Sequence, residues 1–217
     1  MASSTTPGAL FVLMEPQRDD AEFQKWRQHA FDDQIPGLRN KYGLSATDEI
    51  TPSTPYRYLS VYEVDDISKI DEELVKRLQQ DAQEALSRSE WQIYERFRYD
   101  VRDGLGATPP GTVVISHGQT PKDDPATVDE FHRWYNEQHI GHIREIPGWR
   151  TGSRYKFLHR SGDQAEYAAP IAVVHQYDEN NGIGGPEFNE SVNNPWTKRI
   201  RSLMSVPNHR RVWKVDF

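Results

Sequence analysis

The feature that most constrains this chain is an internal repeat. A segment that begins at Phe23 with the pattern Phe-x-x-Trp recurs at Phe131, half a chain length later. Each copy runs on to the same Ile-Pro-Gly sequence, at 35–37 and at 146–148. In a chain of 217 residues, a repeat on this scale predicts two similar lobes that stabilise each other by packing together.

Composition narrows the class of partner. Lys and Arg total 26 against 33 Asp and Glu, and the interspersed charges argue against a nucleic-acid partner. The absence of cysteine excludes disulfides, thiolate metal sites and a cysteine nucleophile. The first residues do not resemble a signal peptide, and no apolar run approaches the roughly 18 residues of a membrane span. We therefore expect a soluble cytoplasmic protein, monomeric or homodimeric, with no membrane partner.

Apolar patterning predicts the same order of elements in two lobes, 8–103 and 112–217, joined by a linker rich in glycine and proline at 104–111. Strands are expected at 9–14, 38–44, 56–64, 94–101, 113–117, 150–158, 171–177 and 210–215. Helices are expected at 20–35, 68–86 and 129–146, with a shorter one after 186. Each lobe thus has a β-α-β-β-α-β order.

This order is typical of ferredoxin-like folds of the α+β class, in which two helices cover one face of a four-stranded antiparallel sheet. The strands are too continuously apolar for their other face to lie in water. We expect the two sheets to pack against each other as one intramolecular α+β barrel with its helices outside.

The second copy of the repeat carries a distinctive series of residues, Phe131-x-x-Trp134-Tyr135, His139-Ile140, Ile146-Pro147-Gly148-Trp149 and Arg154-Tyr155. This series resembles the helix signature of the EthD-type dimeric α+β barrel proteins. The likeness covers the second lobe well and the first lobe weakly. Two departures are Gly141-His142, where the family has Pro-Leu, and Phe31 of the first lobe, which stands in place of the histidine. The resemblance implies that this tandem chain builds internally the barrel that most relatives form by homodimerisation.

The resemblance also implies a cavity between sheet and helices that holds a small hydrophobic substrate, often aromatic or polyketide-like. Such proteins include polyketide cyclases, lactone isomerases, cofactor-free monooxygenases, haem-dependent enzymes and stress proteins. We expect a cofactor-free lyase or isomerase of the cyclase or dehydratase type, acting in secondary metabolism. A cofactor-free or haem-dependent oxygenase and a non-catalytic small-molecule binding protein remain alternatives, because fold alone does not choose among them.

Three histidines are the candidates for chemistry. His139 follows Tyr135 by four residues on the helix flank that should face the sheet, where it would serve as a general acid or base or as a buried structural histidine. His175 alternates with apolar residues on one strand, and His117 is expected on the neighbouring strand. We expect His139 and His175 to form the catalytic pair. The other candidates would bind the substrate: His117, Trp134, Tyr135, Tyr155 and Tyr177.

The remaining patterns favour neither a metal site nor chemistry in the first lobe. His139 and His142 are three residues apart, but no carboxylate shares their helix face, so we expect no metal and no cofactor. In the first lobe, Phe31, Ser60 and Glu15 stand at the places that match His139, His175 and His117. We therefore expect the reaction in the second lobe.

Overall fold

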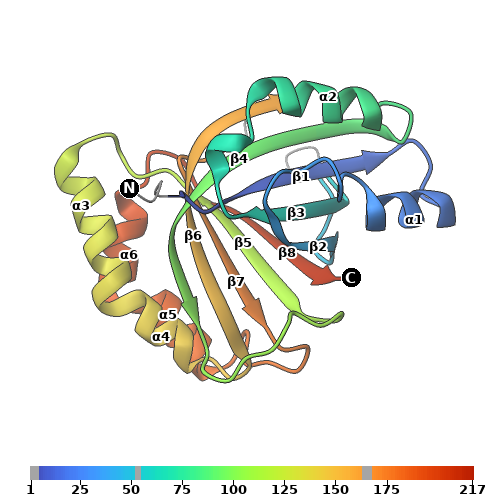
Figure 1. Ribbon diagram of the computed structural model, residues 1–217. Coiled ribbons are helices and arrows are strands. Elements are labelled where there is room, and N and C mark those ends of the chain that lie inside the picture. The colour runs from blue at the N-terminus through green and yellow to red at the C-terminus, as the bar shows by residue number, and fades with distance from the viewer. Residues whose placement is uncertain (1–4, 52–54, 163–167) are drawn as a thin grey trace.

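Eight antiparallel strands form one closed barrel, in the order β1-β3-β2-β8-β5-β7-β6-β4 (Figure 1). The computed structural model describes residues 5–51, 55–162 and 168–217. The strands are β1 Gly8–Pro16, β2 Leu38–Ala46, β3 Tyr58–Val64, β4 Leu86–Val101, β5 Val113–Gln119, β6 Trp149–Gly162, β7 Ile171–Tyr177 and β8 His209–Val215. The expected α+β barrel is confirmed.

The helices lie outside the barrel in two groups (Figure 1). The first half has α1 Ala21–His29, a short 3-10 helix η1 Ile67–Lys69 and α2 Glu72–Ala82. The second half has α3 Pro125–Trp134, a π-helical turn η2 Tyr135–His139, α4 Ile140–Glu145, α5 Pro186–Asn193 and α6 Pro195–Ser202. Among the described residues, no helix has both the length and the apolar character that crossing a membrane requires.

The two halves of the sheet have the same strand order, β4-β1-β3-β2 and β8-β5-β7-β6. The edge strands of one half pair with those of the other, β2 with β8 and β4 with β6. These two pairings provide hydrogen-bond partners for backbone N–H and C=O groups that would be unpaired at the edges of separate sheets. β4 ends at Val101 and β5 begins at Val113, on either side of the expected linker.

Side-chain alternation along the strands separates the core into three layers. The barrel interior holds one cluster, with Phe11, Leu44 and Trp213 among its residues. A second cluster lies between the first half's sheet and its helices α1 and α2. A third lies between the second half's sheet and helices α3 to α6. The outer faces of the two half-sheets are therefore the places where helix and sheet residues meet.

Two predicted helices are longer than the observed ones. The first was expected to reach residue 35 but ends at His29, because the chain turns into a left-handed conformation at Phe31, with φ 66°. The second was expected at 68–86. It starts after Asp71, whose side chain accepts the backbone N–H of Leu74, and stops at Ala82. Leu86 instead begins β4, which pairs with β1 and is twice as long as the expected strand 94–101.

Candidate functional site

A cavity of about 230 Å³ lies between the outer face of the second half's sheet and its helices. Its floor comes from β5 and β7, its walls from the α3–α4 segment, α5 and α6, and its opening from the 203–208 loop and β8. The residues with chemistry that line it are His117, His139, His175, Tyr177, Arg201 and Arg210. Apolar groups, including Trp134 and Ile200, make up most of the remaining wall.

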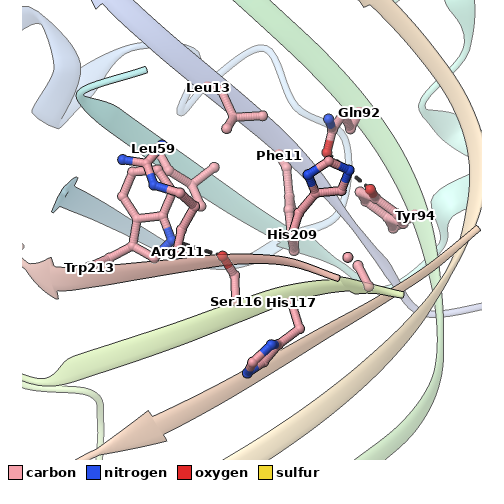
Figure 2. A pocket seen from close by; sticks show the side chains of 12 residues that line it. Phe11, Leu13, Leu59, Gln92, Tyr94, Ser116, His117, His209, Arg211 and Trp213 are labelled. Atoms are coloured by element: carbon pink, nitrogen blue, oxygen red, sulfur yellow. Dashed lines mark hydrogen bonds between the residues drawn. The ribbon is translucent and has the colours of Figure 1, made fainter. Parts of the chain in front are cut away.

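Strand pairing explains why two of the histidines meet here. His175 lies directly opposite Ile115 in the β5–β7 pair, and His117 is two residues further along β5 on the same face. Figure 2 shows Ser116 and His117 leaving β5 in opposite directions, with Ser116 bonded to Trp213 on the barrel side. The sequence-based placement of His117 and His175 on one face therefore matches the structure.

His139 reaches the cavity through an irregular helix turn. In a π-helix, hydrogen bonds join residues five apart, and such turns occur often at functional sites. The turn η2 stacks the His139 ring on Trp134, five residues earlier, with centroids 4.2 Å apart and planes 22° from parallel. The His139 Nδ1 atom is enclosed and has no hydrogen-bond partner among the described residues. This nitrogen is thus a buried polar atom whose hydrogen-bonding capacity the described residues leave unused.

His175 is held more tightly. Its Nε2 lies 2.7 Å from the Tyr135 hydroxyl, and its Nδ1 lies 3.4 Å from Trp149 Nε1. The Thr151 backbone also hydrogen-bonds the ring. Protein groups therefore engage both nitrogens of His175, and Tyr135 sits behind it without lining the cavity. Tyr135 holds His175 in place and does not contact the cavity space.

Burial keeps all three histidines neutral. It lowers the pKa of His117 to about 3 and that of His175 to about 4, and it lowers the pKa of His139 well below the ordinary value of 6.5. The neighbouring histidines and arginines lower the pKa of His117 and His139 further. At neutral pH each imidazole is therefore uncharged, and its lowered pKa makes it a weaker base than an exposed histidine.

Tyr155 does not belong to this site, contrary to expectation. It lies on β6 with its side chain in the barrel interior, where its ring packs 5.3 Å from that of Phe11. The expectation failed because strand parity on β6 could not be read from the sequence. Of the expected substrate-binding residues, His117, Trp134 and Tyr177 line the cavity.

Arg201 and Arg210 are the residues that sequence reasoning missed. Both are exposed at the opening of the cavity. The pairing of β8 with β5 places Arg210 directly opposite His117. Without knowledge of this pairing, the sequence does not indicate that Arg210 lies at the cavity. Arg201 lies in the last turn of α6, a segment that the sequence predicted only as a short helix.

The first half fills the same layer with structural residues. Strand register places Ser60 at the position of His175 but Met14, not the expected Glu15, at that of His117. Phe31 packs against Trp26 and Trp91. At the place of Tyr135, the first half has Arg27, which is buried and bonds the Leu44 carbonyl and Asp216. The first half's layer is therefore a packed core.

The cavity fits neither a bound metal ion nor a haem. Among the described residues, no group of three or more His, Asp or Glu side chains is arranged to hold a metal ion. A cavity of about 230 Å³ is too small for a porphyrin macrocycle with its propionates.

No family model matches the chain, and no curated protein matches it in sequence. Solved structures match it in fold. A protein proposed to be a chlorite dismutase aligns with TM-score 0.58 at 11% identity, over 98% of this chain and 96% of its own. An anthrone oxidase-like protein aligns with TM-score 0.57 at 14% identity, over 100% and 93%. A protein from Fusobacterium nucleatum, proposed to be a monooxygenase, aligns with TM-score 0.56 at 11% identity, over 98% and 94%.

At these identities the comparisons show the fold alone. This chain shares its α+β barrel fold with these three proteins, and the alignments span nearly the whole length of both partners. The function must be argued from the cavity itself.

Proposed function

We propose that this chain is a cofactor-independent acid/base enzyme, an EthD-type tandem barrel of two ferredoxin-like lobes. It would act as a lyase or isomerase of the cyclase or dehydratase type on a small aromatic or polyketide-like molecule in the second half's cavity. One observation carries the proposal. Three neutral histidines converge on a largely apolar cavity, and the Nδ1 of His139 has no partner among the described residues.

The geometry divides the roles. His139 would remove a proton next to a carbonyl or from a phenol, since its side chain lines the cavity and no described residue bonds its Nδ1. The anion that forms would raise the pKa of the nearby imidazoles and so favour the transfer. His117, for which the structure gives no hydrogen bond within the described residues, would donate a hydrogen bond to the developing oxyanion. His175, expected to be the second catalytic residue, would orient the site, because both of its nitrogens are engaged.

Deuterium exchange tests this proposal without knowledge of the natural substrate. The native protein should speed the exchange of the acidic C–H protons of 2-tetralone, a small enolisable bicyclic ketone, in D2O. His139→Ala should reduce the rate by about 10²-fold or more, the usual contribution of a general base. His29→Ala is the matched control, since His29 is exposed on α1 in the first half. Equal rates in the native protein and His139→Ala would remove His139 from the mechanism.

A cofactor-free oxygenase is the second candidate, and the names of two fold neighbours favour it. One is an anthrone oxidase-like protein and another is proposed to be a monooxygenase. The same deprotonation by His139 would start such a reaction, with molecular oxygen as the second substrate. Oxygen uptake by an electrode, in step with loss of a phenolic substrate, would separate this reaction from an isomerisation. Binding without any turnover would instead indicate a small-molecule carrier.

A further inference from the structure

The opening of the cavity carries two arginines that form no ion pair with any described acidic residue. Arg201 and Arg210 both line the cavity and both are exposed. Within the described parts of the chain, neither guanidinium forms an ion pair or a side-chain hydrogen bond. Their neighbours behave differently: Arg199 pairs with Glu130 at 2.6 Å, and Arg211 bonds Asp48 at 3.0 Å. The two cavity arginines therefore differ from Arg199 and Arg211, whose charges are neutralised by ion pairs.

Local charge at this opening is opposite to that of the whole chain. The net charge is −7, yet among the described residues no Asp or Glu lines the cavity, and the charged residues there are Arg201 and Arg210. Both arginines also disfavour a proton on His117 and lower its pKa. An anion bound between them would offset this repulsion.

We propose that the ligand of this cavity is a mono- or bicyclic aromatic carboxylic acid, with its carboxylate bound by Arg201 and Arg210 and its ring inside. This inference rests on the proposed function and specifies its substrate class. A guanidinium matches a carboxylate in geometry and charge. The volume of about 230 Å³ is below the roughly 300–1,000 Å³ of sites for drug-sized ligands, so the ring system must be small.

The surroundings favour a carboxylate over a phosphate. Phosphates are commonly held by the N-termini of helices, where backbone N–H groups point at the anion. Arg201 instead lies at the C-terminal turn of α6, where the partial charge of the helix is negative. A monoanion is better tolerated there than a dianion.

Calorimetry with two isosteric probes tests the proposal. 2-Naphthoate should bind the native protein about tenfold more tightly than neutral 2-naphthamide, as a charge-assisted hydrogen bond predicts. Arg201→Gln and Arg210→Gln should each remove most of this preference by weakening naphthoate binding far more than naphthamide binding. Added salt should weaken naphthoate binding and leave naphthamide binding unchanged. The matched control is Arg77→Gln, which makes the same change at an exposed position on α2.

Three results would overturn the proposal: equal affinity for acid and amide, a preference that survives both arginine variants, or no naphthoate binding at millimolar concentration. Tighter binding of 2-naphthyl phosphate than of naphthoate would likewise replace the carboxylate with a phosphate ester. The outcome is separable from that of the proposed function. An arginine-dependent preference for naphthoate in a protein that exchanges no protons would support the ligand class and reject the enzyme.

Discussion

A few side-chain changes at matching positions distinguish the layer between sheet and helices in the two halves: side chains pack it in the first half, and a cavity lies in it in the second. Where the first half has Ser60, the second has His175, and where the first has the buried Arg27, the second has Tyr135 to hold that histidine. His139 replaces Phe31, which fills the first half's core. The backbone order is shared, so the difference between the two halves in this layer comes from these side chains.

Gly152 is a residue on which the position of His175 depends. It lies directly opposite His175 in the β6–β7 pair, and a Cβ there would lie 2.8 Å from the His175 Nδ1 and Cε1 atoms. The ring cannot move aside without losing its bond to Tyr135. Gly152→Ala should lower the deuterium-exchange rate at least tenfold and the free energy of unfolding by about 1–3 kcal/mol.

The control for this change is Gly141→Ala. Gly141 is in α4, and a Cβ there would meet nothing within 4 Å. This variant should keep the native exchange rate and gain about 0.5–1 kcal/mol of stability, since alanine favours a helix more than glycine does. Similar behaviour of the two alanine variants in exchange and in urea unfolding would contradict the packing argument.

The buried histidines predict how stability depends on pH. Their folded-state pKa values lie below 6.5, at about 4 for His175 and about 3 for His117. Between those values and pH 6.5 the unfolded chain binds protons that the folded chain does not, so stability falls as the pH falls. Each such histidine contributes about 1.4 kcal/mol per pH unit in this window.

Urea unfolding of the native protein and of His175→Gln between pH 7 and pH 4 measures this contribution. The variant should show a slope smaller by about one proton, because glutamine does not titrate. An identical slope in both proteins would mean that His175 is protonated in the folded state.

Residue-level prediction from the sequence succeeded where periodicity alone sets the direction of a side chain. Alternation along β5 and along β7 sets the directions of His117 and His175, and both side chains line the cavity on the same face of the sheet. Tyr155 was misplaced because its strand contacts helices on one face and the barrel interior on the other, and residues on both faces are buried over 149–155. Arg210 could not be predicted as a cavity residue, because its place opposite His117 depends on the long-range pairing of β8 with β5.

At the scale of elements, each repeat helix brings a tryptophan into contact with the ring five residues later, but the two helices do so with different backbone conformations. In the second half the π-helical turn stacks His139 on Trp134. In the first half the helix ends, and the left-handed turn at Phe31 sets its ring edge-on to Trp26, with centroids 5.8 Å apart. The sequence predicted a helix in both copies but not these irregularities, because tertiary packing selects them.

Because Phe31 has a positive φ, we expect glycine at this position to destabilise the protein less than alanine, the reverse of the usual order. Phe31→Ala should cost about 3–5 kcal/mol of stability through the lost aromatic packing. Phe31→Gly should cost about 1 kcal/mol less, because glycine adopts the positive φ of 66° without strain. Urea midpoints of the two variants test this. A glycine variant less stable than the alanine variant would show that the left-handed turn is absent.

At the scale of the whole molecule, the barrel closes only because the edge strands of one half pair with those of the other. The sequence predicted the barrel from the apolar character of both strand faces, and this part of the fold was confirmed. Which edges meet, and the length of β4 that makes one junction, could not be predicted, because they depend on register between distant segments. We propose that the boundary between the halves lies at 104–111.

We propose that the second half holds the ligand and that the first half does not. A crystal structure of the native protein with 2-naphthoate tests this most directly. We expect density for the ring beside Trp134 and His139 and for the carboxylate at Arg201 and Arg210, with none in the corresponding layer under α1 and α2. Density in the barrel interior or in the first half, with the second half's cavity empty, would contradict it.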